Sequence, residues 1–382
     1  MPNSAATGDP HFGFHVQRQH VGRPLPLLSD KCLKAGTAPL SLEMKLVFGR
    51  DRTISVTPEG FGAEAQWAQG SAKAPTWATA PLPLAGLKNV ESQAPGTQGH
   101  PRIAAEDEPP VIDSNEDREG LAWQTGVWNR IADIYPREID QRFAPVVEAL
   151  IERAGLCSGE QVLDLGTGTG AVAKRAAAIV GASGCVLGVD ISSEMLGLAR
   201  HSAARLGLRN LKFLEGRAEA IPAEDAAFDV VLACLSMMYV IDRETAALQI
   251  ARVLKPRGRF IAAVWAGPEQ CDIVLFQQTA GRFAGPPPVP GVGPGALADT
   301  SGFLRQLDAA GVSAHVETEL LGFDFPNFTL AWDTLAGVTA AQLAPERQRE
   351  AKDAIMAAMY PDGDGPRHFR NATHFIVGRV SD

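Results

Sequence analysis

The residues with the clearest chemical potential are residues 162–170, which read Val-Leu-Asp-Leu-Gly-Thr-Gly-Thr-Gly. An apolar segment leads into three glycines, and a helix-forming segment follows. Glycines in such a turn adopt unusual backbone angles and let a ligand approach the backbone, because they carry no Cβ. Open α/β sheets bind ligands just beyond the carboxyl ends of their strands, which is where this turn is expected to lie.

Two acidic residues indicate which ligand this turn accepts. Gly166, Gly168 and Ala171 also fit a loose dinucleotide motif, so an NAD(P)-dependent oxidoreductase is one alternative. Asp164, two residues before the first glycine, would crowd a pyrophosphate but suits a cationic ligand. Asp190 follows an apolar strand, where a carboxylate accepts both hydroxyls of an unphosphorylated ribose. A nucleoside with a positively charged amine, a sulfonium and a free ribose satisfies both carboxylates.

At this point the sequence resembles the class I S-adenosylmethionine (SAM)-dependent methyltransferases, in the ubiquinone/menaquinone-biosynthesis-like (methyltransferase type 11) branch. The resemblance covers about Trp123 to Val264. It implies a Rossmann-like fold, SAM as methyl donor and S-adenosylhomocysteine as product. Five ordered segments carry it: Val162–Gly170, Gly188–Ser192, Glu215–Pro222, Phe228–Asp242 and Ile250–Val264.

The resemblance also implies a set of SAM contacts. Asp164 is expected to face the methionine amine, and Asp190 the ribose hydroxyls. Many relatives have Asp where this chain has Arg217, so the contact to the adenine amino group is expected to rest on Ala218 or Glu219. The full predicted set is Tyr135, Asp164, Gly166, Thr167, Gly168, Gly170, Asp190, Ile191, Met195, Arg217, Ala218, Glu219, Cys234 and Leu235.

An aromatic segment upstream, residues 128–135, resembles the family's first helix, which folds over the cofactor. Tyr135 is the residue expected to touch SAM. The alternative is that Trp123, Trp128 and Tyr135 simply face the core.

Several residues are candidates for the acceptor side. A sulfonium is an activated leaving group, so the protein mainly aligns the reactants and excludes water, and a base is needed only if the acceptor loses a proton. Tyr239, His368 and His374 are the candidate proton-transfer residues, and Arg367 and Arg370 are candidate contacts for an acidic acceptor. Ser236, Met237 and Met238 precede Tyr239 and either line an apolar, adaptable pocket or pack in the core. We expect a small, partly apolar acceptor methylated on oxygen, nitrogen or a ring carbon.

The secondary-structure elements that position these groups are indicated by alternating strand and helix signals from about residue 117. These signals predict an α/β fold with a mostly parallel seven-stranded sheet, an antiparallel last strand, and a cap built from insertions at about 268–300 and 327–371. The predicted strands are Gln161–Leu165, Cys185–Val189, Leu211–Leu214, Phe228–Ala233, Arg259–Trp265, Ala314–Phe325 and His374–Val380. The predicted helices are Ile139–Ala154, Ala171–Val180, Ser193–Leu206, Arg243–Leu254, Ile273–Phe283, Phe303–Ala310, Ala331–Leu343 and Glu346–Met359.

The composition of the chain bears on its domain organisation, its partners and its cysteines. Residues 1–115 are rich in Pro, Gly, Ala, Ser and Gln and predict a low-complexity, disordered or loosely structured extension, apart from a short hairpin over Leu40–Thr57; residues 116–382 form the predicted SAM-dependent methyltransferase domain. A net charge of −9 argues against a nucleic-acid partner, and no apolar run is long enough to span a membrane. Five scattered cysteines predict neither a metal site nor disulfides, as expected for a cytoplasmic protein. A methyltransferase-like protein that binds SAM without turnover is the second alternative.

Overall fold

A computed structural model describes residues 44–48, 52–56 and 115–381, with two compact units, Met1–Ser92 and Gln93–Asp382. In the first unit, β1 (Met44–Phe48) and β2 (Arg52–Val56) pair antiparallel. This pairing confirms the short hairpin predicted over Leu40–Thr57. The rest of the predicted extension lies outside the described residues.

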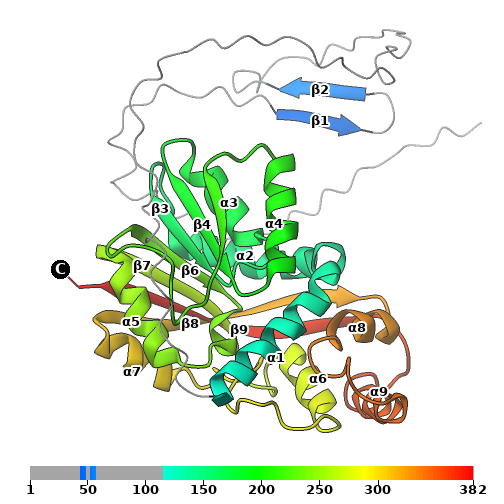
Figure 1. Ribbon diagram of the computed structural model, residues 1–382. Helices are drawn as coiled ribbons and strands as arrows, with labels where there is room; N and C mark the ends of the chain where they lie inside the picture. The colour runs from blue at the N-terminus through cyan, green and yellow to red at the C-terminus, as the bar shows by residue number, and fades with distance from the viewer. Residues whose placement is uncertain (1–43, 49–51, 57–114, 382) are drawn as a thin grey trace, which may run out of the picture. The chain divides into compact units, whose positions relative to one another are not determined.

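The second unit is built on a seven-stranded sheet with the order β5-β4-β3-β6-β7-β9-β8 (Figure 1). The strands from β5 to β7 run parallel, whereas β9 is antiparallel to both of its neighbours. The sheet therefore confirms the predicted fold class. Its strands are β3 (Gln161–Leu165), β4 (Cys185–Asp190), β5 (Leu211–Glu215), β6 (Phe228–Cys234), β7 (Leu254–Trp265), β8 (Val312–Phe325) and β9 (Arg367–Val380).

Helices cover both faces of this sheet. Right-handed crossovers run from β3 through β4 to β5 in one direction and from β6 to β7 in the other, so α3 and α4 lie on the face opposite α5. Every residue of β4 is buried, as expected for a parallel strand covered on both sides. The helices are α1 (Asn115–Ile131), α2 (Asp140–Ala154), α3 (Ala171–Val180), α4 (Ser193–Arg205), α5 (Arg243–Val253), α6 (Asp272–Gly281), α7 (Ser301–Ala309), α8 (Phe328–Leu335) and α9 (Pro345–Met359). Within the described segments, no helix has the length and apolarity needed to span a membrane.

Three predicted elements differ from the structure by more than three residues. Strand β7 begins at Leu254, five residues before the predicted start at Arg259, because Leu254 already pairs with Phe228 on β6. The helix predicted over Ala331–Leu343 was wrong in its second half, because α8 ends at Leu335 and the chain then turns through Gly337. A Cβ on Gly337 would lie 2.7 Å from Ile131 Cγ2, so this turn packs tightly against the end of α1. Strand β9 begins at Arg367, seven residues before the predicted start, because its first half pairs with the long edge strand β8.

The two insertions lie next to one another in space. Helices α6 and α9 pack together, and Figure 1 shows α6, α8 and α9 gathered at one side of the sheet. Asn371, on β9, fixes the first turn of α6, since its buried Oδ1 accepts a hydrogen bond from Ile273 N at 3.0 Å. One amide side chain thus joins the insertion to the sheet.

Asn371→Ala tests this joint. The change leaves the Ile273 N–H buried without its partner, which costs about 1–3 kcal/mol in the free energy of unfolding. Urea denaturation measures the loss. Arg370→Ala is the control, because the Arg370 side chain on the same strand is exposed and its removal is expected to change stability by less than about 0.5 kcal/mol. Equal stability of Asn371→Ala and wild type would contradict this account.

Candidate functional site

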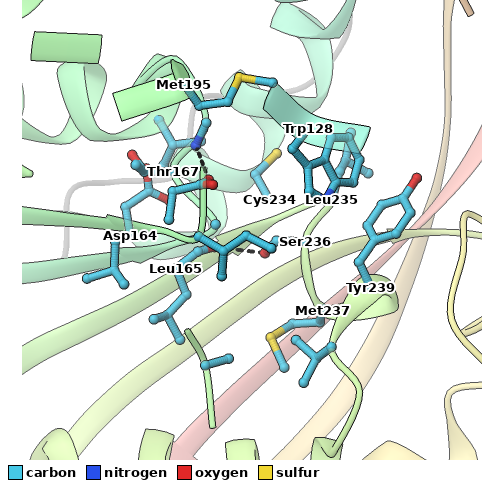
Figure 2. A pocket seen from close by; sticks show the side chains of 18 of the residues that line it. Trp128, Asp164, Leu165, Thr167, Met195, Cys234, Leu235, Ser236, Met237 and Tyr239 are labelled. Carbon is cyan, nitrogen blue, oxygen red and sulfur yellow. Dashed lines mark hydrogen bonds between the residues drawn. The ribbon is translucent and has the colours of Figure 1, made fainter. Parts of the chain in front are cut away.

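The predicted cofactor residues converge on one cavity at the carboxyl ends of β3, β4 and β6 (Figure 2). The chain changes crossover direction between β3 and β6, which is where open α/β sheets bind ligands. Every predicted cofactor contact except Gly170 lines this cavity, and Tyr239 does as well. Gly170 instead begins α3, with a φ of 77°.

Asp164 is the most unusual group in the cavity. It lies within β3 and is only 1% exposed, because the neighbouring strands and the glycine turn enclose it. Its Oδ2 accepts a hydrogen bond from Thr167 Oγ1 at 2.7 Å, but its Oδ1 has no hydrogen-bond partner among the described residues. Desolvation, opposed by hydrogen bonds from the Thr167 hydroxyl and the Ala173 backbone, raises the pKa of Asp164 to about 7. A buried carboxylate oxygen in this state is a strong site for a cationic donor.

Asp190 ties the glycine turn to the end of β4. Its Oδ2 accepts a hydrogen bond from Gly168 N at 2.8 Å, and its Oδ1 accepts one from Ser192 N at 2.9 Å. Burial raises its pKa despite hydrogen bonds from the backbone of Ser192, Gly168 and Ile191. Each carboxylate oxygen can accept a second hydrogen bond. Asp190 can therefore receive two hydroxyl groups while it keeps the turn in place.

A neighbouring segment leaves no room for a side chain at the first glycine of the turn. Gly166 has a φ of 68°, and a Cβ there would lie 2.3 Å from the Cβ of Ser236. Ser236 follows β6, and its hydroxyl donates to the Leu165 carbonyl at 2.7 Å (Figure 2). Leu235, just before it, is a non-glycine residue with a φ of 56°. Strain of this kind often accompanies ligand sites, and here it turns the chain along the cavity wall.

Helix α1 covers the cavity. Leu121, Gln124 and Trp128 are spaced three and four residues apart, so they share one helix face, and all three line the cavity. Gln124 Nε2 donates to the Tyr239 carbonyl at 2.8 Å, and the Trp128 ring meets the Tyr239 ring edge-on at 4.8 Å.

A second contact joins α1 to the segment after β4, because Ser192 Oγ donates to Asn129 Oδ1 at 2.6 Å. Met195 packs with buried α1 side chains next to this contact. The upstream aromatics are thus both core and cavity wall: Trp128 and Tyr135 line the cavity.

Both tyrosines of the cavity stay protonated. Burial is the main cause of a strongly raised pKa at Tyr135, and the nearby Tyr239, Asp190 and Asp140 add to it. Burial likewise raises the pKa of Tyr239. Each phenol is therefore a hydrogen-bond donor rather than a base at neutral pH.

The structure also places a residue in the cavity that the sequence did not suggest. Asp140 begins α2 and accepts hydrogen bonds from Thr169 Oγ1 at 2.8 and 2.9 Å. Burial raises its pKa. Only its place beside the apolar stripe of Ile139, Phe143 and Val147, which lines the same cavity, distinguishes it in the sequence.

The structure does not bring the predicted histidines to this site. His368 Nδ1 bonds to Asp324 at 2.9 Å and His374 Nδ1 to Thr318 at 2.8 Å, both between β9 and β8, and neither lines the cavity. Arg367 is paired with Asp272 at 3.1 Å, and Arg370 contacts that carboxylate through its backbone. Met237 lines the cavity, whereas Met238 is buried in the core. Within residues 118–381, no cluster of three His, Cys, Asp or Glu residues could hold a metal ion.

Comparison with known proteins agrees with this geometry. Residues 156–275 match the family model of a methyltransferase domain. This segment is therefore similar to the methyltransferase domains of that family. It includes the strands β3 to β7, and the cavity residues Asp164 and Asp190 lie within β3 and β4.

The chain also resembles curated methyltransferases over about 120 residues. Ubiquinone/menaquinone biosynthesis C-methyltransferase UbiE of Marinomonas sp. is 35% identical over 120 residues, which are 31% of this chain and 48% of that protein. UbiE of Hahella chejuensis is 34% identical over 119 residues, again 31% and 48%. The chain thus spans about half the length of these relatives.

Solved structures with a similar fold include YcgJ of Bacillus subtilis, with a TM-score of 0.47 and 20% identity over 63% of this chain and 99% of that one. Phosphoethanolamine N-methyltransferase 2 of Haemonchus contortus, solved with SAM, has a TM-score of 0.41 and 17% identity over 62% of this chain and 53% of that one.

Gly166→Ala tests the packing of the glycine turn. Gly168→Ala is its matched control, because Gly168 also has a positive φ, of 54°, but a Cβ on it would meet no atom within 4 Å. Both changes strain the backbone by about 1–2 kcal/mol, and only Gly166→Ala also clashes with Ser236. Thermal denaturation should show the larger loss for Gly166→Ala, and adding Ser236→Gly should recover part of it. Equal losses for the two alanine variants would contradict the close approach.

Proposed function

We propose that the protein is a SAM-dependent methyltransferase that acts on a small molecule. The observation that carries the proposal is the buried Asp164 Oδ1, which has no hydrogen-bond partner in the described part of the chain and lies beside a turn rich in glycine. A cationic amine at this oxygen would offset the cost of burying it. The match of residues 156–275 to a methyltransferase domain supports the same ligand.

The lining of the cavity fits the parts of SAM. Asp164 would hold the amine, and Asp190 the ribose hydroxyls, with the backbone of Gly166 and Gly168 alongside. Ile191 and the buried Met195 offer apolar surface to the adenine. Arg217, Ala218 and Glu219 lie at the same wall, and Glu219 Oε1 already accepts hydrogen bonds from Ile241 N and Asp242 N.

When bound, SAM supplies a methyl group on an activated sulfonium, so the protein needs to orient the reactants and exclude water. Trp128, Tyr135 and the rest of the α1 face would exclude water from above the glycine turn. Tyr239 would donate a hydrogen bond toward the acceptor, since its raised pKa keeps the phenol protonated. The proposal therefore assigns no base to Tyr239.

Calorimetric titration with SAM tests the donor site. Asp190→Ala is expected to weaken SAM binding by about 1–3 kcal/mol, because it leaves ligand hydroxyls without acceptors. Glu215→Ala is the matched control, since this exposed carboxylate ends the neighbouring strand β5 outside the cavity lining. Wild-type affinity in Asp190→Ala would contradict the assignment. S-adenosylhomocysteine formed from SAM in a metabolite extract then separates an enzyme from a protein that binds SAM without turnover.

Binding should also depend on pH. With a raised pKa of about 7, Asp164 becomes protonated as the pH falls through 7, and the neutral acid cannot pair with the amine. SAM affinity is therefore expected to fall about tenfold per pH unit below 7, with proton release on binding. Titrations between about pH 7.5 and 5.5 in buffers of different ionisation enthalpy measure both effects. Asp164→Asn should flatten the dependence; an equally steep slope in that variant would assign it to another group.

A further inference from the structure

A second cavity of about 440 Å³ lies next to the first, and the two share Tyr239 as a wall. Its volume falls in the range of about 300–1,000 Å³ that is typical of small-molecule sites. Helix α1 contributes Trp123, α6 contributes Val274 and Gly281, and the turn after α8 contributes Val338. The loop over residues 284–296, rich in Pro and Gly, forms another side, and the cavity is open to solvent there. The cavity therefore belongs largely to the two insertions.

Among the described residues, no charged side chain lines this second cavity. Two of its polar side chains are already paired, because Gln277 Nε2 donates to the Leu335 carbonyl at 2.7 Å and Thr339 Oγ1 donates to Gln277 Oε1. Gln278 is different, since its side chain is exposed at the edge of the cavity and its amide makes no hydrogen bond within the described part of the chain. Gly295 leaves room beside that amide, as a Cβ there would lie 3.2 Å from Gln278 Nε2. One neutral amide is thus available to a ligand.

Two nearby cations are engaged elsewhere, and Arg282, which follows Gly281, is exposed and does not line the cavity. Arg243 holds the loop to the segment after β6: its Nη2 donates to Gly291 O at 2.7 Å and to Met238 O at 3.2 Å. Gly293 N donates to the same Met238 carbonyl at 3.0 Å. Arg367 is paired with Asp272. The loop is therefore fixed against the wall shared with the first cavity, and neither guanidinium is placed to pair with an anionic ligand.

We infer that this second cavity is the acceptor site and that it takes an uncharged, largely apolar ring compound, with Gln278 as its hydrogen-bonding contact. The role of this cavity as the acceptor site rests on the proposed methyl transfer. The choice of an uncharged ligand does not, because it follows from the residues that line the cavity. A carboxylate or phosphate would lose its hydration here without gaining a cation. The predicted role of Arg367 and Arg370 for an acidic acceptor is not supported by this arrangement.

A pair of probes tests the inference: 4-phenylphenol, and the same molecule with a carboxylate, 4′-hydroxybiphenyl-4-carboxylate. Each is titrated calorimetrically into the full chain at about pH 7.5, with and without saturating S-adenosylhomocysteine. We expect 4-phenylphenol to bind at least about tenfold more tightly than its carboxylate, because a buried unpaired charge is costly. Equal or tighter binding of the carboxylate, or no binding of either probe, would overturn the inference.

Two variants locate the binding. Gly281→Phe fills the cavity, since a Cβ on Gly281 lies at an ordinary 3.6 Å from Thr339 Cγ2 and the ring extends from there. Gln278→Glu introduces a charge with almost no change of shape, and Gln342→Glu is its matched control, because Gln342 is also exposed but does not line the cavity. Both cavity variants should weaken 4-phenylphenol at least about tenfold, whereas Gln342→Glu should not.

Binding of S-adenosylhomocysteine separates the two ways in which the experiment can fail. Unchanged affinity for it in the cavity variants shows that they are folded, so unaltered 4-phenylphenol binding in such a protein would overturn the inference. If the wild-type chain bound 4-phenylphenol but not S-adenosylhomocysteine, the proposed function would fail while the second cavity remained a binding site.

Discussion

The burial of Asp164 is the constraint on which the candidate site depends. A carboxylate in the middle of a covered parallel sheet loses its hydration, and the Thr167 hydroxyl and the backbone N–H of Ala173 replace only part of it, since Oδ1 keeps no hydrogen-bond partner among the described residues. The surrounding chain does not neutralise the group, since Asp190 adds a second negative charge close by. Such a cost is typical of sites where a ligand supplies the missing partner. The charge of the cavity therefore favours a cation before any family is considered.

The glycine turn, β4 and β6 form one unit around this carboxylate. Asp190 fixes the turn from one side through Gly168 N, while Ser236 lies against Gly166 from the other. Leu235 takes up a strained backbone conformation so that the chain can turn at this point. Helix α1 joins the same unit through Asn129 and Gln124. A change in any of these contacts should therefore alter the surroundings of the Asp164 carboxylate.

The two cavities differ in charge. The two reactants of the proposed reaction would differ in the same way. The first cavity has four carboxylates and one guanidinium in its wall and suits a cationic nucleoside, whereas the described lining of the second carries no charge and suits an uncharged ring. Tyr239 stands between them and is held by Gln124 and Trp128, so its position depends on α1. The same helix contributes to both cavities, which would couple closure over one to closure over the other.

The sequence by itself determined the fold class, most element boundaries and most of the residues that line the first cavity. These follow from local signals: buried apolar runs, helical periods and a glycine turn flanked by Asp164 and Asp190, all within about thirty residues. Tertiary structure alone decided what comes from distant segments. It brought Asp140 and Gln124 into the cavity, placed His368 and His374 on β9 against β8, and ended α8 where Gly337 meets Ile131. Local patterns carry no information about which distant chain packs at a given place, and that packing built the second cavity.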